Sequence, residues 1–288
     1  MNRIYAKANI LYVPALLIVL VFVIYPFFDG IRIAFTNWNG FSRTYSYVGF
    51  LNFRRIFTDG NVLGAARNTL IYGFGSTIIQ QILGLGAALL LNKAFFGRGI
   101  ARTILYIPVM ISAVVMGYMW RYLTQFEGAL NDILILFGNE PILWLSSANL
   151  AISLMVIINS MQYFGISMII YLAGLQSIPQ MYYENAALAG AGRVKTFFYI
   201  TVPLLYPAFS VSILLNLIGG LQLFDVIRAL TGGGPGFSTH SLGTLINTTY
   251  FAQQNAGYSA VIGLFLFILI LLITIIFQVI FSKREVDF

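Results

Sequence analysis

The 288-residue chain is 59% hydrophobic and only 9% charged. Soluble domains carry about a quarter charged residues, so this composition excludes a soluble globular protein and predicts an integral membrane protein. There is no cysteine, which excludes disulfides and cysteine-ligated metals, and we interpret the single histidine, His240, as a surface or loop residue. The net charge of +7 comes from cations scattered singly, which argues against a nucleic-acid partner.

Six apolar runs are each long enough to cross a hydrocarbon core of about 30 Å. A backbone in lipid must satisfy its own hydrogen bonds, so every run is predicted to be a helix. The predicted fold class is therefore an all-α integral membrane protein with six transmembrane helices. No internal repeat or interdomain linker stands out, and we treat residues 1–288 as a single domain. The predicted spans cover residues 10–28, 68–91, 103–123, 149–175, 204–224 and 259–281.

An even number of spans places both termini on one side of the membrane. The positive-inside rule makes the side richer in lysine and arginine cytoplasmic. The first predicted outer loop opposes this assignment, because it carries Arg43, Arg54 and Arg55. The segments on the side of the termini are shorter and more densely basic, so we predict cytoplasmic N and C termini. Their nine cations are Arg3, Lys7, Lys93, Arg98, Arg102, Arg193, Lys195, Lys283 and Arg284.

Residues 177–203, between the fourth and fifth spans, form a polar interruption. Pro179 suits the first turn of a helix, and Gly190 and Gly192 allow a sharp turn. We predict two short helices here, the first built mostly of small residues and carrying Glu184. Such a surface suits close docking into a groove of another protein, although an ordinary cytoplasmic loop is the alternative.

Neutral hydrogen-bonding residues recur at helical spacing on the fourth and fifth spans. Residues at positions i, i+3, i+4 and i+7 share one face of a helix. Amides, a phenol and glycine gaps on such faces suit a neutral, hydroxyl-rich ligand, whereas helix–helix packing is the alternative interpretation. The two faces comprise Asn159, Gln162, Tyr163 and Ile166, and Asn216, Gly219, Gly220 and Leu223.

Several kinds of chemistry are missing from the sequence. There is no GxxxxGK[ST] phosphate-binding loop and no nucleophile–base set, so we do not expect an enzyme. No span carries a chain of ionisable residues suited to a proton relay. A self-sufficient secondary carrier or channel for a small neutral polar solute stays open, because a sodium site built from backbone carbonyls leaves no such trace.

The interruption between the fourth and fifth spans resembles a known family motif. The pattern EAA, three residues, Gly, nine residues, Ile-x-Leu-Pro marks the inner-membrane permease subunits of binding-protein-dependent ABC importers. The chain departs from it at Asn185 and Val202, and carries Ala189 where sugar permeases often have aspartate. These departures make the local docking surface slightly atypical. The residues in register are Glu184, Ala186, Gly190, Ile200 and Pro203.

Further motifs resemble MalF-type sugar permeases, of the compact multiple-sugar or oligosaccharide kind. VGFLNFRRIF followed by NTL is similar to their first outer loop and second span, LTGGGPGFST to the loop after the fifth span, and GY to the entry of the last span. In this sequence the motifs occupy residues 48–57, 68–70, 230–239 and 257–258.

The resemblance implies a multi-pass subunit of a bacterial plasma (inner) membrane importer, with its core fold at about residues 67–281. The implied partners are a second homologous permease, cytoplasmic ATPase subunits and an extracytoplasmic sugar-binding protein. The chain itself would hold no cofactor, since ATP and magnesium belong to the ATPase. It would translocate a sugar, such as an oligosaccharide. The loop at residues 177–203 would couple to the ATPase through Glu184, Ala186, Ala187, Gly190, Ile200 and Pro203.

The resemblance also implies an intramembrane sugar site on the two spans that flank the coupling loop. Carried over by position, it falls on the two faces found above by spacing, so the substrate-binding residues would be Asn159, Gln162, Tyr163, Ile166, Asn216, Gly219, Gly220 and Leu223.

Overall fold

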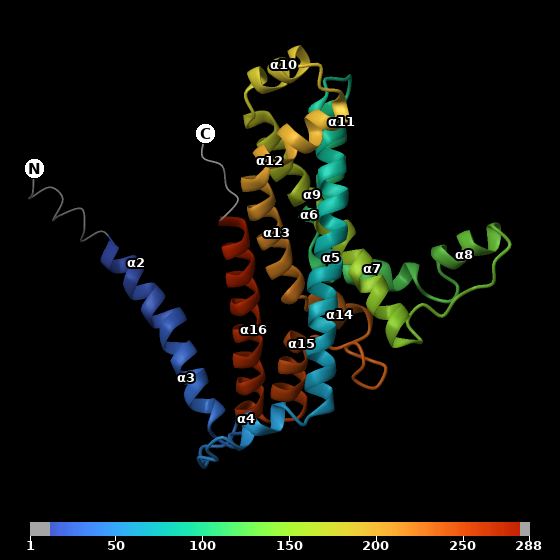
Figure 1. The fold of residues 1–288 in the computed structure, drawn as a ribbon. Helices are drawn as coiled ribbons and strands as arrows, with labels where there is room; N and C mark the ends of the chain where they lie inside the picture. Colours follow the sequence, from blue (N-terminus) through green and yellow to red (C-terminus); the bar gives the residue numbers. More distant parts are fainter. Residues whose placement is uncertain (1–11, 283–288) are drawn as a thin grey trace, which may run out of the picture. The chain divides into compact units, whose positions relative to one another are not determined.

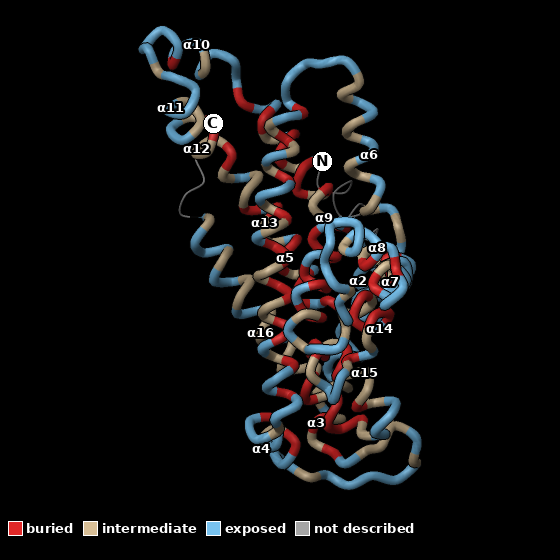
Figure 2. The backbone as a smooth tube through the Cα atoms, turned by 90° about the vertical axis from the view of Figure 1, so that its right-hand side faces the viewer, coloured by how far each residue is buried: buried red, intermediate tan, exposed pale blue. Residues whose placement is uncertain are grey.

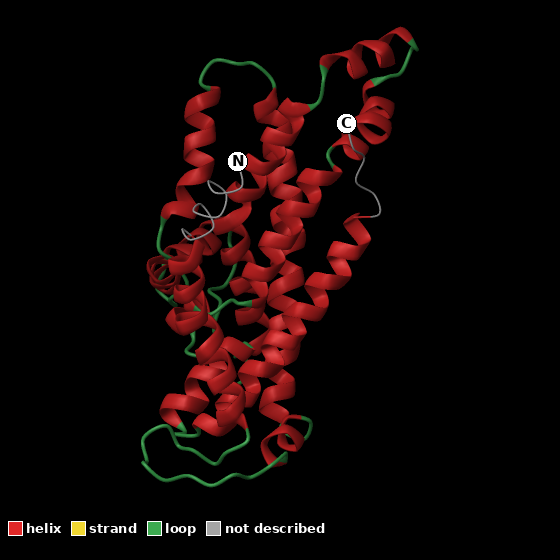
Figure 3. Ribbon diagram, turned by 90° about the vertical axis from the view of Figure 1, so that its left-hand side faces the viewer, coloured by secondary structure: helices red, strands yellow, loops and turns green. Residues whose placement is uncertain are grey.

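The structure, a computed structural model, describes residues 12–282. Within these residues it contains helices and loops and no strand beyond one isolated antiparallel bridge between Thr36 and Tyr47 (Figure 3). The first two residues of the predicted first span lie outside the described residues. So do four of the nine cations used to orient the chain, namely Arg3, Lys7, Lys283 and Arg284.

Two compact units make up the chain. The first comprises Met1–Leu63 with Leu245–Leu266, and the second comprises Gly64–Thr244 with Phe267–Phe288. Three helices contribute residues to both units: α5 (Gly60–Asn92), α15 (Leu242–Asn247) and α16 (Ala256–Ser282). The remaining described helices of the first unit are α2 (Tyr12–Val19), the π-helical turn η1 (Leu20–Ile24), α3 (Tyr25–Ala34), α4 (Leu51–Ile56) and the π-helical turn η3 (Thr248–Ala252).

The second unit holds the rest of the described helices. They are α6 (Arg98–Met110), α7 (Ala113–Leu123), α8 (Ala129–Leu136), α9 (Ala148–Ser177), α10 (Gln180–Leu188), α11 (Arg193–Thr196), η2 (Phe197–Thr201), α12 (Val202–Leu204), α13 (Tyr206–Leu221) and α14 (Asp225–Leu230).

Five helical stretches of the described chain are long and apolar enough to cross a membrane: Tyr12–Ala34, Gly60–Asn92, Ala148–Ser177, Tyr206–Leu230 and Ala256–Ser282. The third predicted span is different, because α6 and α7 meet at 94°. Counting this bent pair as one span gives six. The expectation of a straight helix over residues 103–123 is wrong because Pro108 lacks a backbone N–H and Ile111 and Ser112 adopt extended backbone angles.

α9 is the most enclosed membrane helix of the second unit. Its apolar window is 61% buried, against 33% for α5 (Figure 2). α13 and α6 pack against α9, and α14 packs against α7. In Figure 1, α10 lies beyond the ends of α5 and α13, and α11 lies near the upper end of α5. α9 is therefore the central membrane helix of the second unit.

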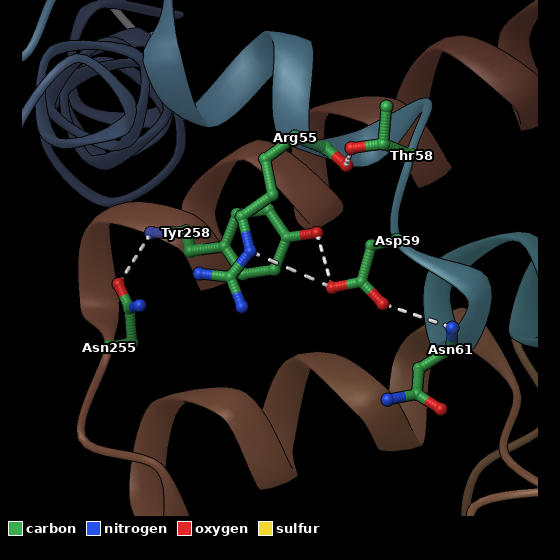
Figure 4. Close-up of polar contacts among 6 residues, drawn as sticks. All are labelled: Arg55, Thr58, Asp59, Asn61, Asn255 and Tyr258. Carbon is green, nitrogen blue, oxygen red and sulfur yellow. Dashed lines mark hydrogen bonds and ion pairs between the residues drawn. The ribbon is translucent and has the colours of Figure 1, made fainter.

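In the first unit, the motif at residues 48–57 is tied to the motif at residues 257–258 (Figure 4). The hydroxyl of buried Tyr258 donates to Asp59 Oδ2 at 2.9 Å, and the Arg55 guanidinium lies 4.1 Å from the centroid of the Tyr258 ring. Arg55 Nε is also 3.7 Å from the same carboxylate oxygen. The backbone N–H of Asn61 donates to Asp59 Oδ1 at 3.0 Å. One carboxylate thus fastens the start of α5 to the start of α16.

Asn52 closes the end of α3 in the same unit. Its Nδ2 donates to the carbonyls of Ala34 and Thr36 at 3.0 and 2.9 Å. Gly257 N donates to Trp38 O at 2.9 Å, so the chain after α3 lies directly against the start of α16. Asn52 belongs to the motif at residues 48–57 and Gly257 to the last one, which gives both motifs a structural role.

In the second unit, the glycine-rich loop packs onto the NTL motif of α5. Asn68 Nδ2 donates to Ser238 O at 2.7 Å and to His240 O at 3.0 Å, and Thr69 Oγ1 accepts from Leu242 N at 2.9 Å. His240 lies in a loop as predicted, but it is buried rather than at the surface, with Nδ1 2.9 Å from Thr244 Oγ1. Burial, together with Arg228, lowers the pKa of His240, so the folded loop favours the neutral imidazole.

We predict that Gly257→Ala destabilises the fold. A Cβ at this position would lie 2.0 Å from Thr36 O, closer than any real contact, so backbone must move. Overpacking of this kind costs about 1–3 kcal/mol. The midpoint temperature of unfolding should be lower than in the wild-type protein. It is measured by heating detergent-purified protein and following the loss of folded protein by size-exclusion chromatography.

Gly263→Ala is the matched control on the same helix, since its Cβ would meet nothing closer than Ile246 Cδ1 at 3.9 Å. Equal midpoints for the two variants would contradict the packing argument.

Candidate functional site

A cavity of about 290 Å³ lies in the second unit among α5, α7, α9, α13 and α14. The structure brings seven of the eight sequence-predicted substrate residues to its wall: Asn159, Tyr163, Ile166, Asn216, Gly219, Gly220 and Leu223. Pockets that hold small ligands begin at about 300 Å³, so the cavity is of a size to enclose part of a small ligand.

Two asparagines, one on α9 and one on α13, belong to this wall. Both Asn159 on α9 and Asn216 on α13 are buried within the protein. The side-chain amide of Asn159 hydrogen-bonds to none of the residues the structure describes, while Asn216 Nδ2 donates to Ser167 Oγ. Asn216 is therefore held by a neighbouring helix, and the side-chain amide of Asn159 is left without a partner among the described residues.

The two glycines of the cavity wall, Gly219 and Gly220, have different structural roles. A Cβ on Gly219 would meet no atom within 4 Å, so this glycine leaves open space in the wall. A Cβ on Gly220 would lie 2.8 Å from Ser76 Oγ and 2.9 Å from Gly73 Cα. Gly220 thus also lets α13 approach α5 closely, which is the usual reason for small residues between membrane helices.

The structure places Gln162, the eighth predicted residue, at the break between α6 and α7. It is buried and does not line the cavity, and its Nε2 donates to Ile111 O at 2.9 Å. This carbonyl belongs to the bend where α6 ends, so it has lost its helical partner. Gln162 satisfies it from α9.

Part of the cavity wall is formed by residues that were not among those predicted from the sequence. Gln80 on α5 and Asp225 at the start of α14 both line it, as do Ala113, Leu215, Gln222 and Phe224. Gln80 Nε2 donates to Asn159 O at 3.1 Å, and its Oε1 has no partner among the described residues. A polar residue inside an apolar run was the available signal, because such residues are expensive in membranes and usually face a functional interior.

A buried hydrogen-bond network extends from Asn216. Gln81 on α5 accepts from Tyr171 of α9 and, at 2.9 Å, from Ser212 Oγ of α13. Gln81 Nε2 donates to Ser167 Oγ at 3.4 Å, and Ser167 accepts from Asn216. The network therefore ties the three helices together and leads to an asparagine on the cavity wall.

The segment predicted to couple to a partner does form two short helices, α10 and α11, with Glu184 exposed on α10 and Ala186 buried. Gly190 has a φ of +73° and ends α10. Gly190 N donates to Ala187 O at 3.0 Å and Ala191 N to Ala186 O at 2.9 Å. This is a Schellman cap, which explains the glycine four residues after Ala186.

The other two predicted coupling residues, Ile200 and Pro203, lie in η2 and α12, and both are half-buried. Exposed apolar side chains surround the Schellman cap instead. Leu188 is 87% exposed and Val194 is 71% exposed. The surface of α10 and α11 therefore combines one carboxylate with uncovered apolar groups.

A cavity with amide side chains on its wall, enclosed by apolar helices long enough to span a membrane, fits the class of membrane transport proteins. Residues 80–286 match the family described as binding-protein-dependent transport system inner membrane component, and the chain belongs to this family.

A relative from Thermococcus litoralis, the trehalose/maltose transport system permease protein MalF, is 34% identical over 265 residues, covering 92% of this chain and 90% of the relative. A crystal structure of a bacterial ABC transporter involved in the import of the acidic polysaccharide alginate is similar with a TM-score of 0.84 at 22% identity, covering 99% of this chain and 98% of that one. The alginate transporter in complex with an alginate pentasaccharide-bound periplasmic protein is similar with a TM-score of 0.81 at 23% identity, covering 96% and 93%.

We predict that Gly190→Ala frays the end of α10. An L-residue held at positive φ costs about 1–2 kcal/mol, and the Schellman cap depends on this conformation. Hydrogen exchange of the amides of residues 186–191 should accelerate several-fold.

Gly192→Ala serves as the control, because Gly192 has an ordinary φ of −72° and its Cβ would meet no atom within 4 Å. Equal exchange in both variants would rule out the cap as the reason for this glycine.

Proposed function

We propose that the chain is the transmembrane subunit of an ABC importer that moves a sugar, such as an oligosaccharide, into the cytoplasm. Its family membership carries this proposal: the family match covers residues 80–286, and a relative named for trehalose and maltose transport is 34% identical over most of both chains. As a membrane component of a transport system, the chain is not an enzyme, and ATP hydrolysis belongs to a separate subunit.

The sugar would bind in the cavity of the second unit. Asn159 and Asn216 offer amides, and Tyr163 offers a ring and a hydroxyl at the same wall. Amides satisfy sugar hydroxyls, which would otherwise lose their hydrogen bonds to water on entering the membrane. Gly219 leaves room for a ring against α13.

α10 and α11 would transmit to the permease the movement of the ATPase that ATP hydrolysis drives. Glu184 is exposed and free to pair with a cation of the ATPase. Leu188 and Val194 expose apolar surface that a partner would cover, as exposed apolar patches outside a membrane commonly mark an interaction site. This end of the second unit would face the cytoplasm. A second homologous permease would complete the pathway, and an extracytoplasmic binding protein would deliver the sugar to the opposite end.

We predict that Glu184→Lys abolishes uptake, lowering it more than 10-fold, while the protein still reaches the membrane. The substitution replaces the carboxylate with a cation, and this cation would be repelled by the cation that the ATPase presents to Glu184. Uptake of labelled sugar in cells, together with ATP hydrolysis by the purified complex, measures the effect.

Glu140→Lys is the control, because it makes the same charge change at an exposed carboxylate on a predicted outer loop. Normal uptake by Glu184→Lys would sink the coupling role. Sugar flux through this chain alone, driven by an ion gradient and indifferent to ATP, would overturn the importer assignment itself.

We predict that Asn159→Leu and Asn216→Leu each lower uptake at least several-fold without loss of complex assembly. Each removes an amide from the cavity wall and leaves ligand hydroxyls without a partner, which costs about 1–3 kcal/mol. The measurement is the concentration dependence of uptake, with assembly checked by co-purification.

Ser160→Ala is the matched control on α9. Ser160 Oγ donates to the Val156 carbonyl of its own helix at 2.6 Å and is absent from the cavity wall. Unchanged kinetics in both asparagine variants would return these positions to plain helix packing.

A further inference from the structure

The charges on the cavity wall are of one sign. Thirteen residues line the cavity, and none of them is lysine, arginine or histidine. Asp225 is the only residue of the wall that carries a formal charge at neutral pH. A ligand in this cavity therefore meets a negative group and no positive one.

Asp225 is uncompensated by the part of the chain that the structure describes. Its carboxylate has no ion-pair partner within 4.0 Å and accepts no hydrogen bond from these residues. Arg228, three residues further along α14, is exposed and does not pair with it. The charge is thus left to act on whatever occupies the cavity.

Gln80 adds a second acceptor to the wall. The residue is 1% exposed, and because Nε2 donates to the Asn159 carbonyl, the atom left without a partner is Oε1. A carbonyl oxygen and a carboxylate both accept hydrogen bonds, and hydroxyl groups donate them. Gln80 Oε1 and the Asp225 carboxylate can therefore both accept from a ligand that presents O–H groups, beside the unpaired amide of Asn159 on the same wall.

We infer that this cavity selects neutral, hydroxyl-donating saccharides and rejects anionic ones, with Asp225 as the residue that discriminates. The inference rests on the proposed function and names the substrate class of the same site. An anionic group on the ligand would meet the Asp225 carboxylate in a low-dielectric interior, where repulsion is far stronger than in water. A ligand hydroxyl would instead donate to it.

The fold alone does not decide whether the cavity takes neutral or anionic saccharides. A relative of this chain is named for trehalose and maltose, whereas a solved structure of the same fold belongs to a transporter of an acidic polysaccharide. Because one architecture serves both, any selection made inside the permease has to come from the side chains of its site. In this chain the wall carries a carboxylate and no cation.

The test compares two trisaccharides that differ by one group: maltotriose, and maltotriose with one terminal hydroxymethyl group oxidised to a carboxylate. Their binding to the full permease–ATPase complex in nanodiscs is measured without the binding protein, so that the permease cavity alone selects. Wild-type complex should bind maltotriose at least 10-fold more tightly than the oxidised form. Asp225→Asn should bring this ratio below about 3-fold.

Asp132→Asn is the matched control, since it removes an exposed carboxylate of α8 outside the cavity, and it should keep the wild-type ratio. An unchanged ratio in Asp225→Asn, or equal binding of the two trisaccharides by wild-type complex, overturns the inference. The proposed function has a separate readout, namely ATP-dependent sugar uptake in the presence of the binding protein. Uptake that persists while discrimination is absent leaves the importer standing and removes only the inference.

Discussion

A backbone carbonyl that is freed where a helix bends or stops, and that the fold then encloses, must find a donor inside the protein. Three amide side chains meet this requirement at three places. Gln162 donates to the Ile111 carbonyl at the bend between α6 and α7, Asn52 donates to two carbonyls at the end of α3, and Asn68 donates to two carbonyls of the glycine-rich loop. The irregular segments of both units depend on these bonds.

The same side-chain chemistry serves the cavity, which is why sequence alone cannot separate the two uses. Asn159 and Gln162 are three residues apart on one face of α9, yet Asn159 opens to the cavity and Gln162 bonds to backbone. Their difference arises from α6, whose bend brings a carbonyl to Gln162. Pro108 is a local signal for a break in this span, but the sequence does not show that the freed carbonyl meets Gln162.

Hydropathy predicted five spans well because their apolar length is a local property of the sequence. The two helices of residues 177–203 were also predictable, since proline and glycine mark their ends. His240 and Asp225 were not, for opposite reasons. The ring of His240 packs against Gly233 and Phe237 of a loop that bonds to Asn68 and Thr69 of α5, and Asp225 lies at a span end yet lines a cavity formed by five helices. Both placements depend on contacts between residues far apart in the chain.

In the proposed importer, the geometry of α9 and α13 explains how a push on α10 and α11 could reach the sugar. α9 is one continuous helix that carries Asn159 and ends at Ser177, just before α10 begins. α13 carries Asn216 and begins just after α12, and the Gln81–Tyr171–Ser212 network clamps both helices to α5. Close-packed interiors transmit displacement instead of absorbing it. Movement of the coupling segment would therefore shift Asn159 and Asn216 together with the helices that carry them. The Asp225 carboxylate at the edge of the cavity would stay in position to discriminate ligands by charge.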